Sequence, residues 1–393
     1  MTRETSVEAR EFAQWIEIEL KPRVLQQQIR PAVFARAKPY IKYLPEALKQ
    51  ETLHNERLIP IWDMIDSKVS ERRIRAGRQA LRRNRDLFNR LEQAFGVEAE
   101  MLMAIWGVET QYGAKRGTHS VLSVLATLAW RGRRQGYYED ELVAALRLVQ
   151  SGACRAEQMH GSLSGAVGHG QLMPTAILDF AVDFDGDGVA SLCADSPDDA
   201  LASIAHFLKK HGWKKGQPWG FEIVLPKGFD CRLIGINEPR PISEWRALGI
   251  VTPDGMPIPD YGPGAVYLPT GIEGVAVLTL NNFHVLLRHD YCLPYALTIG
   301  HLSDRIGGGK AFHGDWPRGE AIVNRSELHE IQHLLTSAGY DTHGLTGLPG
   351  AATDKAVRAW QQDNGVQPDG FLSQRLLLSL RGFAGQTAST RVG

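Results

Sequence analysis

The sequence predicts a mainly α-helical protein with a small β-rich insertion and a second, smaller helical domain at its C-terminal end. Three observations predict this fold class. Apolar residues recur at helical spacing through the first 210 or so residues, whereas residues 214–282 contain short β-type runs between prolines and glycines. Residues 326–380 then form a compact stretch with helical periodicity of its own.

Composition narrows the classes of function. The chain has 393 residues, which corresponds to two or three domains. Its 44 lysines and arginines balance 44 aspartates and glutamates, whereas a dedicated nucleic-acid binder normally carries a basic surplus. No apolar run approaches the roughly 18 residues that a transmembrane helix needs, and the N-terminal residues lack the apolar centre of a signal peptide.

An arginine-rich helix is predicted over residues 70–95. Ile74, Leu81 and Phe88 recur at helix-compatible spacing between the arginines, and Gly96 is suited to end the helix. The arginines permit a nucleic-acid interpretation, but a packed face opposite a solvated basic face fits better with a chain that has no net charge.

The next predicted helix, residues 98–109, carries a candidate catalytic acid. Leu102, Trp106 and Glu109 share one helix face. A carboxyl group among apolar side chains loses solvation, which raises its pKa and lets it keep a proton near neutral pH. Glu109 is therefore a candidate general acid for a leaving-group oxygen. The alternative is a carboxyl group that lies in water at the helix end.

A glycine-rich segment, GSLSGAVGHGQLMPT, follows at residues 161–175. Its glycines allow the backbone to approach a ligand closely. Gln171 adds a donor and an acceptor, as sugar hydroxyl and N-acetyl groups require. Taken alone, the segment also fits an ordinary glycine-rich loop. The glycines in question are Gly161, Gly165, Gly168 and Gly170.

An acidic segment, VDFDGDG, begins like an EF-hand calcium loop. Asp183, Asp185 and Asp187 alternate and are followed by a glycine, which suits the oxygen shell of Ca²⁺. The backbone carbonyl of Val189 is expected to be a further ligand. The twelfth position is Ala194 rather than glutamate, so the usual closing ligand is missing.

A capped helix is predicted directly after the acidic segment. Ser196 is the expected N-cap, Pro197 lies in the first turn, Asp199 occupies the capping-box position, and Gly212 ends the helix.

The β-rich insertion at residues 214–282 lies inside a domain predicted to cover residues 1–306. Its strands are expected in the runs FEIVLP, CRLIGI, AVYLP and GVAVLTL. Helical pattern returns at YALTIGHLSDRI. A linker is predicted at residues 307–325, a C-terminal domain at 326–382 and a flexible polar tail at 383–393.

The cysteines show no C-x-x-C spacing, so neither a zinc ribbon nor a disulfide scaffold is indicated. Buried thiols are the prediction, and a disulfide is the alternative. The four residues are Cys154, Cys193, Cys231 and Cys292.

Several of these segments, taken together, resemble one enzyme family. IWGVETQYG, GSLSGAVGHGQLMPT, VDFDGDG, KKHGW and NNFHVLLRHDYCLPYAL follow one another as in the lytic murein transglycosylases of glycoside hydrolase family 103, of the membrane-bound B type. The resemblance covers roughly residues 10–305. Residues 326–380 separately resemble the three-helix peptidoglycan-binding module, through IQHLLTSAGYD, AVRAWQQDNG, PDG and the residues Gly347, Gly350 and Thr353.

The resemblance implies a lysozyme-like catalytic domain that cuts the bond between N-acetylmuramic acid and N-acetylglucosamine in peptidoglycan. One glutamate, matched here by Glu109 in GVET, protonates the glycosidic oxygen and then accepts a proton from the muramoyl C6 hydroxyl. That hydroxyl closes a 1,6-anhydro ring without water, and no cofactor is expected for catalysis. The alternatives are a muramidase that hydrolyses the same bond and a non-catalytic murein-binding protein.

The resemblance also implies substrate contacts. Ser162 and Gln171 match polar residues that contact substrate in the family, and Tyr295 matches a cleft tyrosine. Trp106 and Tyr112 are candidate lining residues, each with a place in the core as its alternative. The same two interpretations apply to Trp130, Tyr137 and Tyr138.

One pair departs from the family pattern. The family usually has Tyr-Asn where this chain has His289 and Asp290. An imidazole and a carboxylate can replace a phenol and an amide as polar contacts. If Asp290 lay close to Glu109, repulsion between the carboxylates would raise the pKa of the acid further.

The resembling enzymes close their EF-hand-like loop with a later aspartate, which aligns with Asp199. Asp195 and Asp198 are alternatives, and helix capping is the alternative role of Asp199. The resemblance thus implies a structural Ca²⁺ held by Asp183, Asp185, Asp187, Val189 and Asp199.

His329, Glu330 and His333 fit H-E-x-x-H, the helix motif of zinc proteases. Two histidines one turn apart can bind Zn²⁺, with the glutamate as general base. The motif lies in a short helix of the wall-binding module without an enzyme-sized scaffold, so a chance match is the preferred interpretation.

Glycan strands of peptidoglycan are the expected partner, and a monomer that binds no nucleic acid is expected. Because murein lies outside the inner membrane, the expected location is the periplasm, peripheral to or anchored at the outer membrane. The absence of a signal peptide from the sequence then indicates a truncated chain or an unusual export route.

Overall fold

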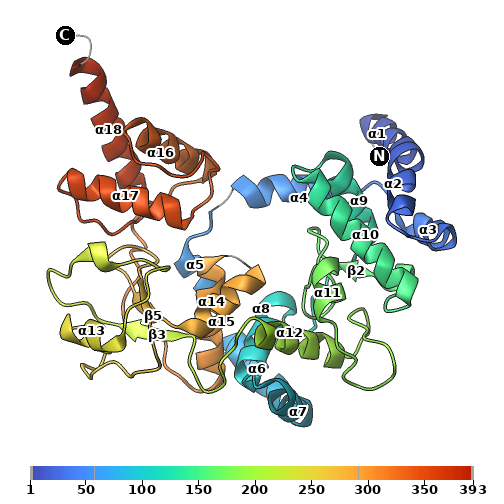
Figure 1. The fold of residues 1–393 in the computed structure, drawn as a ribbon, viewed down its shortest axis with the longest axis horizontal. Helices are drawn as coiled ribbons and strands as arrows, with labels where there is room; N and C mark the ends of the chain where they lie inside the picture. Colours follow the sequence, from blue (N-terminus) through green and yellow to red (C-terminus); the bar gives the residue numbers. More distant parts are fainter. Residues whose placement is uncertain (1–2, 57, 291, 391–393) are drawn as a thin grey trace. The chain divides into compact units, whose positions relative to one another are not determined.

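The computed structural model describes residues 3–56, 58–290 and 292–390 (Figure 1). They form two compact units. The first unit consists of Met1–His54 and Arg72–His211, and the second of Asn55–Glu71 and Gly212–Gly393. Within the described ranges, no helix is both long and apolar enough to cross a membrane.

The first unit is built from helices, with α9 and α10 packed side by side and α11 against α10 (Figure 1). Both α8 and α9 are largely enclosed, and Leu102, Ile105, Leu122 and Leu125 on them are fully buried. Its elements are α1 (Arg3–Trp15), α2 (Lys21–Gln26), α3 (Pro31–Ala37), α4 (Pro45–Glu56), α6 (Glu71–Arg83), α7 (Arg85–Phe95), α8 (Ala99–Thr110), β1 (His119–Ser120), α9 (Val121–Arg131), α10 (Gln135–Ser151), β2 (His160–Gly161), α11 (Pro174–Phe180) and α12 (Asp198–Lys210).

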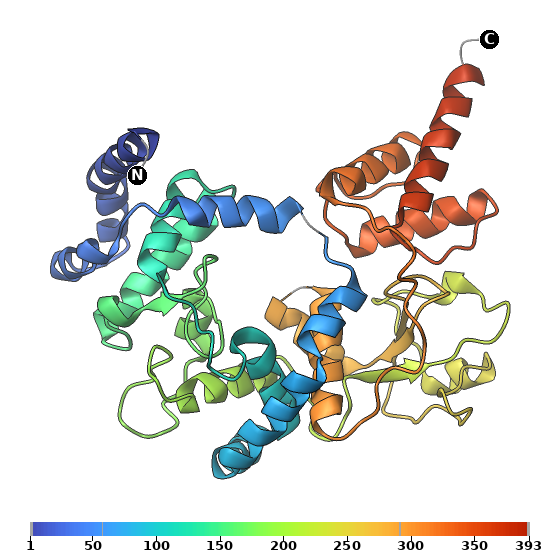
Figure 2. The same ribbon diagram turned by 180° about the vertical axis from the view of Figure 1, so that it is seen from behind.

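The second unit contains the predicted β-rich insertion. Three short antiparallel strands lie in the order β3-β5-β4, and Trp245 is buried beside them with Nε1 donating to the Gly264 carbonyl at 2.8 Å. α5 packs against α15, blue beside orange in Figure 2. The elements are α5 (Ile61–Lys68), β3 (Gly220–Ile223), α13 (Ile242–Ala247), β4 (Ala265–Tyr267), β5 (Ala276–Thr279), α14 (Asn281–Asp290), α15 (Leu293–Ile306), α16 (Arg325–Ser337), α17 (Ala351–Asp363) and α18 (Gln374–Thr390).

The predicted three-helix domain is confirmed as α16, α17 and α18, red in both views of the fold. A capping box begins α16, because Asn324 accepts from the Glu327 amide and the Glu327 carboxylate accepts from the Asn324 amide. Leu328, Val357 and Leu377 form part of its own apolar core. The tail predicted as flexible is helical as far as Thr390, and residues 391–393 lie outside the described residues.

Three local predictions were wrong. The arginine-rich segment forms two helices that meet at Asn84, whose side-chain amide donates to the Ala80 carbonyl at 2.8 Å and competes with the backbone pattern. The run CRLIGI is not a strand, because Cys231–Leu233 form a 3₁₀ turn. α12 begins one residue later than predicted, with Pro197 at its N-cap.

The cysteines also differ from the preferred prediction. Cys154 and Cys193 form a disulfide, with 5.8 Å between their Cα atoms, so the alternative is the correct one for this pair. Cys231 is a buried thiol as predicted, whereas Cys292, also outside the disulfide, is only half-buried.

Candidate active site

Glu109 is the penultimate residue of α8 and is half-buried. The helix before it is almost entirely enclosed, so the end of α8 is held by a rigid core. The chain leaves the helix through Gln111 and Tyr112, which have φ values of 52° and 60°. Non-glycine residues adopt such left-handed conformations at a cost, and these strained turns concentrate at functional sites.

Tyr112 is engaged by the protein itself. Its hydroxyl donates to the Arg73 carbonyl at 2.8 Å, while the Arg73 guanidinium donates to the carbonyl of Gly107 in α8. Burial raises the pKa of Tyr112 to about 12, so the phenol stays neutral and keeps this bond at physiological pH. Tyr112 therefore supports the turn that follows Glu109, and its contact with substrate stays a prediction.

A buried histidine connects α8 with the glycine-rich segment. His169 is 5% exposed and accepts a hydrogen bond at Nδ1 from Trp106 Nε1, at 3.2 Å. An indole nitrogen only donates, so the ring proton lies on Nε2, which donates to the Asp195 carbonyl at 2.9 Å. Burial lowers the pKa of His169, which favours the same neutral form.

Arg116 forms hydrogen bonds with the segment around Asp195 and with the glycine-rich segment. Its guanidinium donates to the Ala194 carbonyl at 2.9 Å and to the Asp195 carboxylate at 2.6 Å. Its own carbonyl accepts from Gln171 Nε2 at 3.1 Å. Arg116 thus links the segment after the disulfide to the predicted substrate-binding glutamine.

Gln171 has its side chain oriented by the backbone. Its Nε2 donates to the carbonyls of Arg116 and Gly168, at 3.1 and 2.9 Å, which uses both amide protons. No hydrogen bond to Oε1 is found among the described residues, so the group offers an acceptor to a ligand rather than both a donor and an acceptor. The residue has a φ of 48°, a further left-handed position in the site.

Ser162 directly follows β2. Its hydroxyl lies 2.8 Å from that of Ser164 and accepts from the Ala166 amide at 3.3 Å. A Cβ at Gly161 would lie 1.9 Å from the Ala166 carbonyl, and one at Gly168 would lie 2.0 Å from the Leu192 carbonyl. These glycines allow close packing within the protein, so they are no direct sign of a ligand.

The remaining predicted substrate residues belong to the second unit. Tyr295 lies in the first turn of α15, and His289 near the end of α14. Burial lowers the pKa of His289 to about 4, so its imidazole is neutral at pH 7. Asp290 ends α14, but its side chain lies outside the described residues, and so does the predicted effect on Glu109.

The acidic segment gathers its carboxylates as predicted. Asp183, Asp185 and Asp187 are exposed, and their ligand oxygens lie within 4.8 Å of one another. The amide of Asp187 lowers the pKa of Asp185, but desolvation and the surrounding carboxylates outweigh it and raise that pKa. Mutual repulsion of this kind is what a bound divalent cation relieves, so the donor set fits Ca²⁺.

Asp199 closes this loop rather than capping α12. Its carboxylate accepts from the amides of Phe184 and Ser191, both at 2.8 Å, and from that of Asp185 at 3.4 Å. The side chain is 4% exposed. Asp199 therefore fixes the fold of the acidic segment, but it is not one of the three carboxylates gathered there, so its role as a metal ligand stays a prediction.

The zinc-protease motif lies on α16 without a third ligand. His329 and His333 are exposed, and both oxygens of Glu330 accept from the guanidinium of Arg381 at 2.7 Å. In the described part of the chain, the acidic segment is the one group of three or more acidic, histidine or cysteine side chains placed to hold a metal. The geometry thus supports a chance match.

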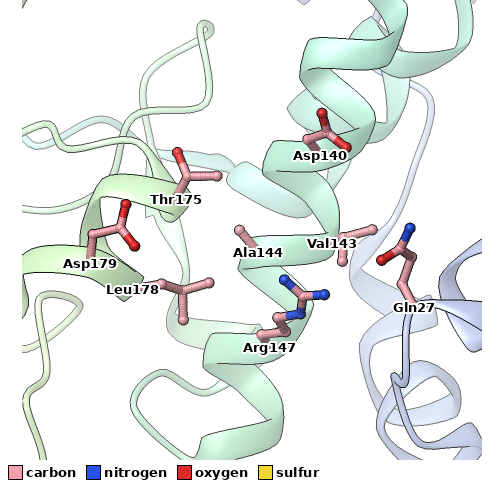
Figure 3. Close-up of a pocket in the computed structure, with 8 residues that line it drawn as sticks. All are labelled: Gln27, Asp140, Val143, Ala144, Arg147, Thr175, Leu178 and Asp179. Atoms are coloured by element: carbon pink, nitrogen blue, oxygen red, sulfur yellow. The ribbon is translucent and has the colours of Figure 1, made fainter.

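A separate cleft of about 280 Å³ lies between α10 and α11. Figure 3 shows α10 with Thr175 and Asp179 of α11 on one side and Gln27 on the other, toward which Val143 points. None of the predicted site residues lines it, so the cleft contributes nothing to the candidate active site.

His169, Arg116 and the disulfide were not identified from the sequence. His169 lies in the glycine-rich segment, in which only the glycines and Gln171 indicate ligand binding. Arg116 follows α8 and belongs to no recognisable sequence motif. These residues are recognised only from their contacts with residues distant in the chain, which no sequence motif indicates.

Two family profiles together match most of the chain. The family profile described as "Transglycosylase SLT domain" matches residues 11–304, and that of the "Putative peptidoglycan binding domain" matches residues 324–380. Membrane-bound lytic murein transglycosylase B of Escherichia coli (strain K12) is 32% identical over 228 residues, which are 56% of this chain. The match spans only 60% of that relative's length.

Solved structures are similar as well. SltB3 from Pseudomonas aeruginosa, in complex with NAG-anhNAM-pentapeptide, has 37% sequence identity and a TM-score of 0.90 over 94% of this chain and 99% of its own. Escherichia coli Slt35 in complex with calcium has 25% identity and a TM-score of 0.62 over 76% of this chain and 92% of its own.

Proposed function

The chain belongs to the transglycosylase SLT domain family, and from this membership we propose that it is a lytic transglycosylase of peptidoglycan. Its substrate is the β-1,4 bond between N-acetylmuramic acid and N-acetylglucosamine, and its product carries a 1,6-anhydromuramoyl end. The observation that carries the proposal is the family match over residues 11–304, within which Glu109 is the penultimate residue of a buried helix.

Two further findings support peptidoglycan as the substrate. The SltB3 structure, which aligns with nearly the whole chain, contains an anhydromuramoyl peptide. The C-terminal helices match a peptidoglycan-binding domain. Tethering by that domain raises the local concentration of glycan strands without new contacts at the catalytic residue.

The chemistry requires one carboxyl group. Glu109 donates its proton to the glycosidic oxygen, and the C1–O bond breaks. The muramoyl C6 oxygen then bonds to C1 while its proton passes to the Glu109 carboxylate, which restores the acid. Other glycosidases use a second carboxylate to activate water or to form a covalent intermediate. Here the nucleophile belongs to the substrate, and intramolecular attack can be worth an effective molarity of about 10⁵ M or more.

The other residues of the first unit position the substrate and the acid. Gln171 presents its carbonyl oxygen to a donor such as a sugar hydroxyl or N-acetyl N–H, because both of its amide protons are already used. Ser162, nine residues earlier in the chain, is proposed to add a hydroxyl contact. The predicted substrate contacts of Tyr295 and His289 stay predictions.

Digestion of purified sacculi tests the proposal. Mass spectrometry separates anhydro ends from reducing muramic acid ends by the mass of one water. We expect anhydromuropeptides from the wild-type chain. Reducing ends would instead identify a muramidase, and binding without any release would identify a non-catalytic murein-binding protein.

A structural Ca²⁺ is proposed at Asp183, Asp185, Asp187, the Val189 carbonyl and Asp199. The carboxylates are gathered and the loop is closed by a buried aspartate, which supports this assignment. When bound, the ion would neutralise the acidic loop and fix its conformation. It takes no part in catalysis.

Calcium should therefore stabilise the fold. Free Ca²⁺ at about 100 times its Kd is expected to raise the free energy of unfolding by about 2.7 kcal/mol, measured by chemical denaturation against a chelator control. Asp185→Asn combined with Asp187→Asn should abolish the increase, whereas Asp179→Asn on the exposed surface of α11 should keep it. An identical denaturation midpoint in calcium and in chelator for the wild-type chain would contradict the assignment.

The periplasm is the proposed location. Peptidoglycan is found there, and the Cys154–Cys193 disulfide is typical of an oxidising compartment.

A further inference from the structure

His169 contacts α8 on both sides of the acid. Its Nδ1 accepts from Trp106, three residues before Glu109, and its carbonyl lies 3.1 Å from the hydroxyl of Thr110, the residue after Glu109. That hydroxyl in turn accepts from the Gly113 amide at 3.1 Å. One histidine thus fixes the last turn of the helix through its ring and through its backbone.

The same histidine fixes the glycine-rich loop. It stands two residues before Gln171, and its Nε2 donates to the Asp195 carbonyl at 2.9 Å. The carbonyl of Arg116 orients the Gln171 amide, and the Arg116 guanidinium donates a hydrogen bond to the carboxylate of the same Asp195. The side chain that holds α8 is therefore part of the framework that orients Gln171.

The turn after Glu109 packs directly onto the imidazole ring. Gly113 has a φ of +83°, and a Cβ there would lie 2.7 Å from the ring. Removal of the ring would leave a void beneath Gly113, which directly follows the left-handed residues Gln111 and Tyr112. The turn would then relax and carry the end of α8 with it.

We propose that His169 is a positioning residue that sets the distance between Glu109 and Gln171. The inference rests on the proposed transglycosylase activity. His169 itself touches neither the reacting atoms nor the substrate. Its loss acts through the placement of the acid relative to the bound sugar, and a misplacement of about 1 Å can lower a rate by about 10²-fold.

The test measures kcat, KM and thermal unfolding of the full chain on soluble, uncrosslinked murein glycan strands. His169→Ala is expected to lower kcat by about 10- to 100-fold with a much smaller change in KM. His206→Ala is the matched control, because His206 also packs on aromatic rings in the same unit, those of Phe95 and Phe180, and has Nδ1 3.1 Å from the Phe180 carbonyl. These contacts go to residues outside α8. His206→Ala should lower the melting temperature similarly and leave kcat within about twofold.

Two more variants keep the test decisive if His169→Ala does not fold. His169→Phe retains a ring beneath the turn but loses both ring hydrogen bonds, and it is expected to show part of the loss of kcat seen in His169→Ala. His169→Gln, which keeps an acceptor and a donor, should recover part of the rate. A wild-type kcat in His169→Phe, or an equal fall in His206→Ala, would overturn the inference. Absence of product from the wild-type chain would instead refute the proposed function.

Discussion

The Glu109→Gln variant is expected to release essentially no anhydromuropeptides from sacculi. General acid–base catalysis by a positioned side chain contributes about 10²–10⁴-fold, and here one residue serves as acid and then as base. Glutamine has the same size and can still hydrogen bond, but it has no proton to give to the glycosidic oxygen. The initial rate of muropeptide release, followed by chromatography, measures the loss.

Glu100→Gln is the matched control for this variant. Glu100 lies on the same helix, in its first turn, and is also half-buried. The substitution should leave the rate of release unchanged. A Glu109→Gln variant that released anhydromuropeptides as fast as Glu100→Gln would exclude Glu109 as the catalytic acid.

Removal of the disulfide is expected to have the largest effect on stability. Cys154 and Cys193 are 39 residues apart, and closing a loop of that length restricts the unfolded chain by about 4 kcal/mol in the chain-entropy model. The Cys154→Ala/Cys193→Ala double variant should lose an amount of this order. Urea denaturation under oxidising and reducing conditions measures it.

The reductant provides the internal control. The wild-type chain and a Cys292→Ala variant should both lose stability when reduced, because Cys292 takes no part in the disulfide. The double variant should not respond. Equal denaturation midpoints for oxidised and reduced wild-type chain would show that the disulfide does not stabilise the fold.

Periodicity was sufficient to predict the elements that are long or regular. The helix of Glu109, the β-rich insertion and the three C-terminal helices lie where apolar spacing put them. The arginine-rich helix failed because one side chain, Asn84, bonds to the turn before it, an effect that period analysis does not detect. The strand predicted in CRLIGI was wrong because a short apolar run does not distinguish a strand from a buried turn.

The sequence predicts individual residues of the candidate site, but not the contacts between them. Family motifs pointed to Glu109 and Gln171, but not to the use of both Gln171 amide protons by the backbone. The glycines were read as room for a ligand, whereas Gly161 and Gly168 allow backbone segments of the protein to meet. Contacts such as that of His169 with Trp106 join residues 63 apart, so no local spacing could reveal them.

Digestion of sacculi in ¹⁸O-labelled water tests the central claim most directly, because it follows the atom that attacks C1. If the muramoyl C6 hydroxyl is the nucleophile and Glu109 its base, the new ends contain no ¹⁸O and lack one water in mass. Incorporation of one ¹⁸O atom at each new muramic acid end would show that solvent attacks, and it would contradict the transglycosylase assignment.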